Sequence, residues 1–168
     1  NLIELYKDKE INVVDICSPP YFHFKQIIQA LKHDKHVMVE KPMVLTKNQL
    51  VEIIKFKKKR LKITCLLHSR FRDETNILKQ FITKNTQKFG KLVKIKCKAN
   101  YINNIPKQHN YSFTNKKISG GGPMIDHGSH LIDLIIYLFK FKNFSKHHSF
   151  LFENFVIKKN NRFNIEES

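Results

Sequence analysis

Three short apolar runs rich in β-branched residues, separated by helical patterns, constrain the fold of this chain most strongly. The runs cover residues 11–16, 36–39 and 61–67. Between them, residues 21–33 and 47–59 place apolar side chains at helical spacing, and Thr46 stands where an N-cap is expected. Strand, helix, strand, helix, strand at this spacing predicts a parallel α/β sheet with right-handed crossover connections.

The same patterns predict a core and a binding rim. The side chains expected to face the sheet are Phe24, Ile27, Ile28, Leu31, Leu50, Ile53 and Ile54. A polar cluster follows each strand, and these clusters are Ser18-Pro19-Pro20, Glu40-Lys41-Pro42 and His68-Ser69-Arg70. Ligands of parallel α/β sheets bind outside the carboxyl ends of the strands, so we expect the three clusters to converge on one site.

The pattern changes after Arg70 and predicts a second architecture. Residues 73–83 are helical in pattern, and residues 92–101 alternate polar and apolar side chains. Such alternation is typical of a strand with one face open to water, as in an antiparallel sheet. We expect a loop over residues 102–118 and another strand over residues 150–157. The chain therefore predicts part of an α+β domain with an open, mainly antiparallel sheet.

A glycine-rich stretch, Ser119 to Asp133, leads into the last helix. We expect this helix to begin at Gly122-Pro123, because proline is tolerated in a first helical turn, and to end near Phe139. Asp126 and His130 stand four residues apart and would share one helical face. An acid beside an imidazole can orient it for proton transfer. The competing interpretation is a hydrogen bond on a helix surface.

Charge and cysteine content narrow the function classes. A net charge of +17 is compatible with nucleic-acid binding, but only four of the 31 basic residues are arginine and they are scattered. We therefore expect a solvated basic surface and no specific nucleic-acid partner. No apolar run reaches 18 residues, so no membrane span is expected. The three cysteines predict buried thiols in a reducing, cytoplasmic compartment and no metal site.

Five segments together resemble the Gfo/Idh/MocA oxidoreductases, the glucose-fructose oxidoreductase and inositol dehydrogenase family. They are Val37 to Pro42 with its Glu-Lys-Pro, Ser18-Pro19-Pro20 with His23, Arg70-Phe71, Ser119 to Gly122, and Asp126 to His130. Thr46 after Glu-Lys-Pro also agrees. The resemblance covers residues 1–160 approximately, and it is specific because the spacing between the segments matches as well as their content.

The resemblance implies a nicotinamide-dependent dehydrogenase, with NAD or NADP as cofactor. The substrate would be a sugar, sugar acid or cyclitol, and the full-length form would be a homo-oligomer. The implied catalytic residues are Lys41, Asp126 and His130, and the implied cofactor contacts are Ser18, Pro19, His23, Glu40, Lys41 and Arg70. His130 would take the hydroxyl proton, oriented by Asp126, and Lys41 would stabilise negative charge on the alcohol oxygen.

The sequence lacks the glycine-rich G-x-G-x-x-G turn of a Rossmann domain. We therefore expect a fragment truncated at both ends, with a partial dinucleotide-binding domain over residues 1–69 and a partial C-terminal substrate and dimerisation domain over residues 70–168. Alone, it should bind NAD(P) poorly and be inactive. The alternative is a catalytically inactive short product that acts as a binding or assembly module.

Individual residues also have simpler interpretations. Lys41 could be a surface lysine, His23 could be a surface or capping histidine, and Arg70 could pair with Asp73. His127 precedes a glycine and is expected at the surface.

Overall fold

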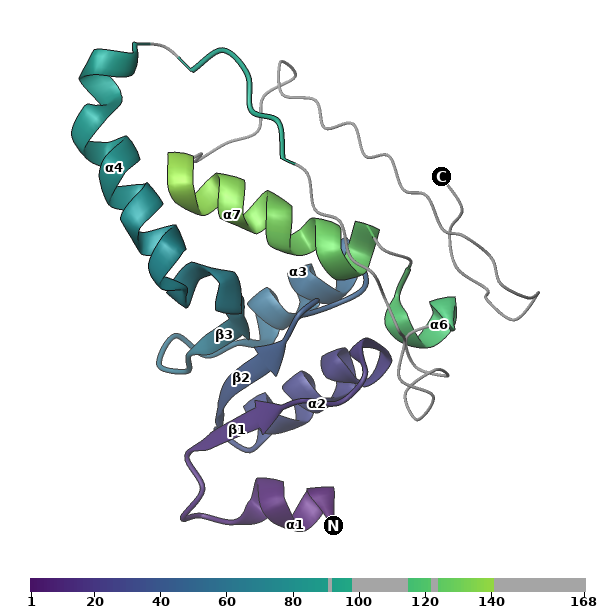
Figure 1. The fold of residues 1–168 in the computed structure, drawn as a ribbon. Helices are drawn as coiled ribbons and strands as arrows, with labels where there is room; N and C mark the ends of the chain where they lie inside the picture. Colours follow the sequence, from purple (N-terminus) through teal and green to yellow (C-terminus); the bar gives the residue numbers. More distant parts are fainter. Residues whose placement is uncertain (91, 98–114, 122–123, 141–168) are drawn as a thin grey trace.

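The computed structural model describes residues 1–90, 92–97, 115–121 and 124–140 (Figure 1). Its first half contains α1 (Leu2–Lys7), β1 (Val13–Ile16), α2 (Pro20–Lys32), β2 (His36–Glu40), α3 (Lys47–Phe56) and β3 (Ile63–Leu66). It continues with the 3-10 turn η1 (His68–Phe71), α4 (Asp73–Phe89), the single turn α6 (Lys116–Ser119), the π-helical turn η3 (Met124–Gly128) and α7 (Ser129–Phe139).

The three strands form the predicted parallel sheet in the order β1-β2-β3. Val14 lies opposite Val37, and Val37 lies opposite Ile63. Each crossover runs through one helix, α2 or α3, because parallel neighbours need a long connection. All three carboxyl ends therefore reach the same edge of the sheet, which confirms the parallel α/β prediction and the expected rim.

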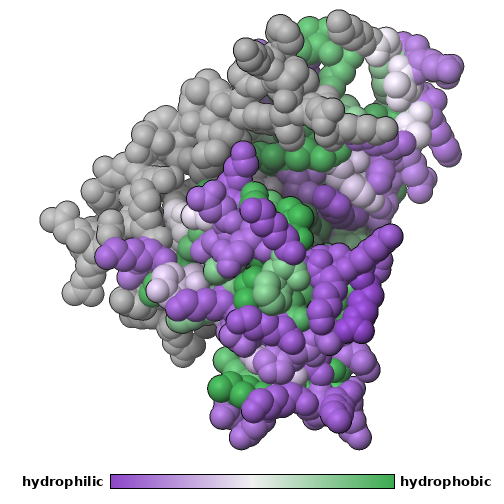
Figure 2. Space-filling model, turned by 180° about the vertical axis from the view of Figure 1, so that it is seen from behind, coloured by the Kyte–Doolittle hydropathy of each residue, from purple (hydrophilic) through white to green (hydrophobic). Residues whose placement is uncertain are grey.

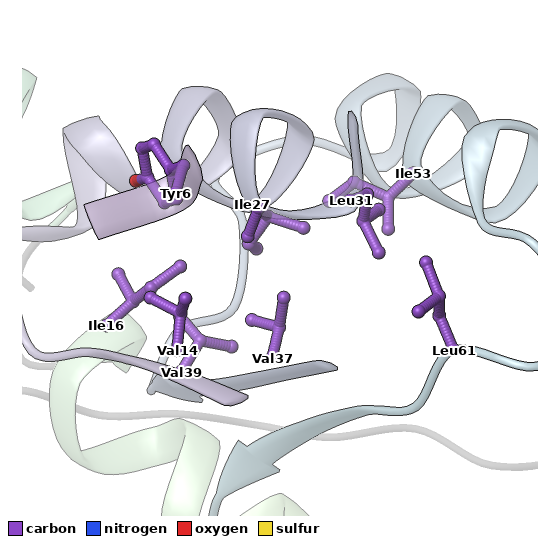
Figure 3. Packing of buried hydrophobic residues seen from close by; sticks show 10 residues of the cluster. Tyr6, Val14, Ile16, Ile27, Leu31, Val37, Val39, Ile53 and Leu61 are labelled. Atoms are coloured by element: carbon purple, nitrogen blue, oxygen red, sulfur yellow. The ribbon is translucent and has the colours of Figure 1, made fainter. Parts of the chain in front are cut away.

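The core lies between the sheet and the helices α2 and α3, which cover one face of it (Figure 3). Ile27, Leu31 and Ile53 are buried against the strands, as predicted, and Phe24 and Ile28 are partly buried. The prediction was wrong for Leu50 and Ile54, which are both exposed. Ile53 lies on the narrow face that α3 turns to the sheet. Its neighbour Ile54 points about 100° away from that face, because adjacent residues of a helix differ by this angle.

Helix α3 begins at the predicted N-cap. The Thr46 hydroxyl accepts the Gln49 N–H at 3.2 Å, and the Gln49 side-chain oxygen accepts the Thr46 N–H at 3.3 Å. The two residues form a complete capping box, which is worth about 1 kcal/mol relative to alanine at the cap. The same Gln49 oxygen accepts the Leu45 N–H at 3.0 Å, so the box also fixes the chain leading from β2.

The second half of the chain differs from the prediction in two ways. Helix α4 continues to Phe89, and Gly90 follows it with φ +70°, a conformation that favours glycine. Residues 92–97 form no strand, because no described strand pairs with them and alternation alone supplies no hydrogen bonds. The expectations for residues 98–101 and 150–157 lie outside the described residues, and α6 occupies the end of the expected loop.

The surface carries hydrophobic residues among the hydrophilic ones (Figure 2). Ile77, Leu78 and Phe81 of α4 are exposed. The expectation of buried thiols was wrong for Cys17 and Cys97, which are exposed. Within the described part of the chain, no helix combines the length and apolar character needed to cross a membrane.

Candidate active site

The carboxyl ends of the strands and the start of α7 come together at one rim. Ser18 and His68 lie two residues beyond the ends of β1 and β3, and Glu40 is the last residue of β2. Turn η3 and the first turn of α7 bring Asp126 and His130 against this rim, although they lie far from it in sequence (Figure 1). The expected convergence of polar residues is therefore found, and residues from the second half of the chain complete it.

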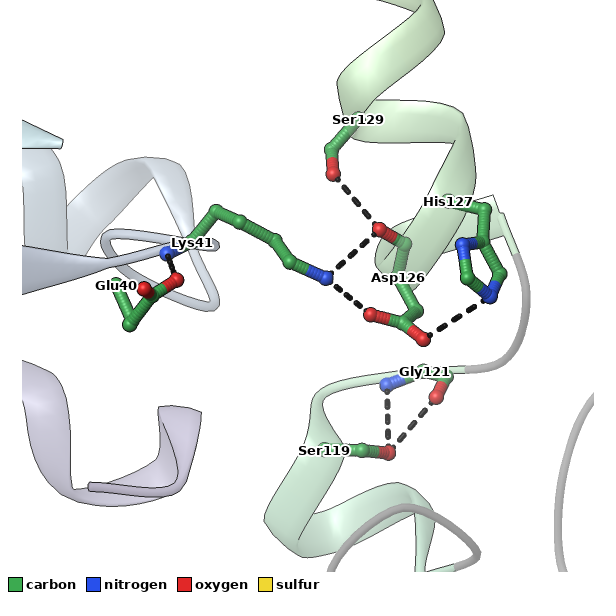
Figure 4. A network of polar contacts seen from close by, with 7 residues as sticks. All are labelled: Glu40, Lys41, Ser119, Gly121, Asp126, His127 and Ser129. Atoms are coloured by element: carbon green, nitrogen blue, oxygen red, sulfur yellow. Dashed lines mark hydrogen bonds and ion pairs between the residues drawn. The ribbon is translucent and has the colours of Figure 1, made fainter. Parts of the chain in front are cut away.

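Lys41 is held firmly by Asp126 (Figure 4). Its Nζ donates to Asp126 Oδ1 and to the Asp126 carbonyl oxygen, the latter at 3.0 Å. Glu40 anchors the base of the lysine, because its Oε2 accepts the Lys41 backbone N–H at 3.2 Å. The Lys41 side chain is only 18% exposed, so the interpretation as a free surface lysine is wrong.

Asp126 does not pair with His130, contrary to the expectation from their spacing. Its carboxylate bonds Lys41 through Oδ1, and its Oδ2 lies 3.4 Å from Nε2 of His127. Asp126 lies in the π-helical turn η3, whose wider winding changes the faces that a regular α-helix would align. His127 is half-buried and contacts this carboxylate, so the expectation that it is a surface residue was wrong.

His130 lies beside a second imidazole. The ring centroids of His68 and His130 are 4.7 Å apart in an edge-on arrangement. Nδ1 of His130 is buried and has no hydrogen-bond partner within the described part of the chain. Burial lowers the pKa of His130 from its ordinary value of 6.5, and the positive charge of Lys41 lowers it further, while Asp126 opposes the shift. The neutral imidazole, which can accept a proton, is therefore favoured.

Arg70 pairs with Asp133 and not with its neighbour Asp73. Its Nε donates to Asp133 Oδ2 at 2.8 Å, and its Nη2 donates to Asp133 Oδ1. This bidentate pair raises the pKa of Arg70 and ties η1 to α7. Because His68 begins η1, the pair also holds its ring near His130. The cofactor contact expected for Arg70 remains a prediction, and Asp133 already occupies its guanidinium.

His23 is buried beneath the rim and connects two strand ends. It is 1% exposed, which contradicts the surface or capping interpretation. Nε2 lies 2.6 Å from the Ser18 carbonyl oxygen, and Nδ1 lies 2.8 Å from that of Pro42. The Ser18 hydroxyl donates to Oε1 of Gln26 at 2.6 Å. Pro19 is the N-cap of α2, so helix α2 controls the path of the chain after β1.

The glycine-rich stretch approaches the loop after β2 closely. Gly120 has φ +85°, and a Cβ built on it would lie 2.2 Å from Cδ2 of Leu45. The backbone conformation therefore favours glycine, and a Cβ at this position would also force the Leu45 side chain to shift. The expected helix start at Gly122-Pro123 lies outside the described residues.

Two residues of the site were not singled out by the sequence. His68 was named only within a strand-end cluster, although a histidine directly after a parallel strand is itself a signal. Asp133 entered only as the last residue of the glycine-rich stretch. Its partner Arg70 is 63 residues away, and no local pattern indicates such a pair.

Comparison with known families matches both halves of the chain. Residues 1–68 match the oxidoreductase family with an NAD-binding Rossmann fold, and residues 78–151 match the GFO/IDH/MocA C-terminal domain.

Two curated relatives carry sugar dehydrogenase names. D-glucoside 3-dehydrogenase of Escherichia coli is 34% identical over 131 residues, which are 77% of this chain and 36% of the relative. Glucose-6-phosphate 3-dehydrogenase of Bacillus subtilis is 31% identical over 131 residues, with 74% of this chain and 36% of the relative covered. The chain thus spans little more than a third of the length of these relatives.

A solved structure shares the fold. The NAD-binding protein from Listeria innocua superposes with a TM-score of 0.70 at 25% identity, over 82% of this chain and 40% of that one. The likeness extends beyond the three-stranded sheet.

Proposed function

The chain belongs to the Gfo/Idh/MocA oxidoreductase family, and from that premise we propose that the native polypeptide carrying it is an NAD(P)-dependent dehydrogenase of a secondary alcohol. The observation that carries the proposal is a lysine ammonium held by Asp126, close enough to His130 to lower its pKa, at the carboxyl rim of the sheet. A cation and a neutral imidazole side by side are what alcohol oxidation needs.

Each of the three residues has a distinct role in this proposal. His130 accepts the proton of the substrate hydroxyl, because its neutral form is favoured. Lys41 donates a hydrogen bond to the same oxygen and stabilises the negative charge that develops there. Asp126 positions the Lys41 ammonium through two contacts, so its role differs from the orientation of His130 that the sequence suggested.

The described residues fit one half of a dinucleotide. Lys41, Glu40 and the orphaned Nδ1 of His130 offer polar groups at the rim where a nicotinamide ring would lie. The start of α2 does not fit a pyrophosphate, since Pro19 and Pro20 have no N–H to donate. A bound NAD or NADP would accept the hydride from the carbinol carbon.

The substrate class rests on the relatives. Two of them are named for oxidation at position 3 of a glucoside or of glucose 6-phosphate. We therefore propose a pyranose ring with a secondary hydroxyl, and a cyclitol as the next candidate. The positive net charge of the chain favours a phosphorylated or acidic sugar.

The proposal is tested by following NAD(P)H formation by the native polypeptide with methyl glucoside, glucose 6-phosphate and myo-inositol. His130→Asn should lower kcat about 10²- to 10⁴-fold and should weaken NADH binding by a much smaller factor. Lys41→Met should lower kcat and also weaken NADH binding, because the proposal gives Lys41 a contact with the cofactor as well as with the alcohol. Lys55→Met is the matched control, since Lys55 is exposed on α3 and far from the site.

Full activity of His130→Asn would remove this residue from proton transfer. Failure of the parent protein to oxidise any of these alcohols with either cofactor would reject the proposed function as a whole.

A further inference from the structure

His23 faces two hydrogen-bond acceptors at the same time. Its Nδ1 lies 2.8 Å from the Pro42 carbonyl oxygen, and its Nε2 lies 2.6 Å from the Ser18 carbonyl oxygen. A carbonyl oxygen can only accept a hydrogen bond, and a neutral imidazole has a single N–H to donate. Both contacts are hydrogen bonds only when both ring nitrogens carry a proton.

We infer that His23 is a buried imidazolium that ties the end of β1 to the loop after β2, and that it is the positioning residue for Lys41. The ring is 1% exposed, and the two carbonyl oxygens compensate its charge. The role for Lys41 rests on the proposed function. The protonation of His23 does not.

The chain around His23 shows why this tie matters for the rim. Pro42 follows Lys41 directly, so a fixed Pro42 carbonyl fixes the backbone from which the lysine side chain extends. Ser18 is held twice from α2, by His23 through its carbonyl and by Gln26 through its hydroxyl. Helix α2 therefore sets the spacing between the carboxyl ends of β1 and β2. His23 acts through Lys41 and Ser18 and does not reach the substrate.

His36 provides an internal reference for the protonation state. Its Nδ1 accepts the backbone N–H of Lys62 at 3.0 Å, so this nitrogen must carry a lone pair. His23 lies in helix α2, and His36 is the first residue of β2, the strand that follows it. The structure thus assigns opposite states to two histidines of one chain.

Nitrogen-detected NMR of the imidazole rings at neutral pH tests the assignment on the chain itself. Both ring nitrogens of His23 should show the shifts of protonated nitrogen, because each faces a carbonyl oxygen. Nδ1 of His36 should show the shift of an unprotonated nitrogen. One unprotonated nitrogen in His23 at neutral pH would overturn the inference, and this test needs no variant to fold.

The positioning role is tested in the native polypeptide with His23→Gln. We expect kcat to fall about tenfold to a hundredfold with a smaller change in the KM for the alcohol, because the lysine is misplaced in the transition state. The matched control is Ala30→Gly, which weakens the same helix at a buried position away from the rim. It should lower the Tm similarly and leave kcat unchanged.

If His23→Gln and Ala30→Gly lower the Tm equally and also lower kcat equally, His23 has only a structural role. Unchanged kcat in His23→Gln would have the same consequence. A protonated His23 in a parent protein without dehydrogenase activity would reject the proposed function and leave the buried imidazolium standing.

Discussion

His130 connects the electrostatics of the site to its pH dependence. Burial is the largest cause of its lowered pKa, followed by the charges of Lys41 and His68, and Asp126 acts in the opposite direction. We expect Lys41→Met to raise the pKa of His130 and Asp126→Asn to lower it further. An NMR pH titration of the His130 ring in each variant measures both shifts, and Lys55→Met should leave the pKa unchanged.

The direction of the shift also gives the sign of its effect on stability. The pKa of His130 is below 6.5 in the folded chain and about 6.5 in the unfolded chain. As the pH falls below about 6.5, the unfolded chain therefore binds this proton before the folded chain does. The contribution of His130 to stability is therefore fully present above pH 6.5 and is lost as the pH falls through the folded-state pKa. Alcohol oxidation should decline over the same range, because the protonated ring cannot accept the hydroxyl proton. An acid-side limb of kcat/KM above pH 6.5 would contradict this assignment.

At the scale of residues, the sequence identified the participants better than their partners. Lys41, Asp126 and His130 were expected at one site, and they lie together at the rim. The pairing of Asp126 with His130 was wrong, because spacing along a helix says nothing about a lysine 85 residues away. A buried or half-buried charge bonds the nearest opposite charge, and that neighbour is set by the tertiary fold.

At the scale of elements, the Arg70–Asp133 pair joins η1 to α7. Asp133 is 11% exposed and Arg70 is 37% exposed, so solvent screens the pair only in part. Arg70→Gln leaves the Asp133 carboxylate partly buried without its cation. We expect this to lower the free energy of unfolding by about 1–3 kcal/mol, measured by urea denaturation.

The double variant Arg70→Gln/Asp133→Asn should recover part of this loss, since it removes the unpaired charge as well. The control pair is Lys58 with Asp34, where both side chains are exposed and Lys58→Gln should change little. Additive losses from Arg70→Gln and Asp133→Asn would show that the pair has no coupling energy.

Elements governed by local rules were predicted well, and those that need a partner were not. The N-cap at Thr46 follows from a hydroxyl reaching an N–H three residues on, which is visible in the sequence. Parallel pairing of the first three strands follows from their helical crossovers. The strand expected at residue 92 needs a neighbouring strand, and the described residues provide none. The outward position of Ile54 likewise depends on how α3 is rotated against the sheet.

At the scale of the whole molecule, the 168-residue chain should bind NAD(P)H weakly on its own. Anion sites at helix N-termini need free N–H groups, and the N-cap Pro19 and the first residue Pro20 of α2 have none. The start of α3 is occupied by its own capping box. None of the five glycines falls in a G-x-G-x-x-G arrangement. Calorimetric titration with NADH and NADPH should give a dissociation constant of about 1 mM or weaker.

The two halves of the dinucleotide should behave differently in this chain. Nicotinamide mononucleotide would meet the polar groups of Lys41, Glu40 and His130, whereas adenosine diphosphate would meet a helix start that lacks the N–H groups of Pro19 and Pro20. Added at millimolar concentration, the mononucleotide should shift the NMR signals of His130 and His68, and adenosine diphosphate should leave them in place. The imidazole of His33, the C-cap of α2, lies away from the rim and serves as the reference for nonspecific attraction to a chain of charge +17. Micromolar NADH affinity, or equal shifts from both nucleotides, would mean that the chain holds the pyrophosphate by groups other than the starts of its crossover helices.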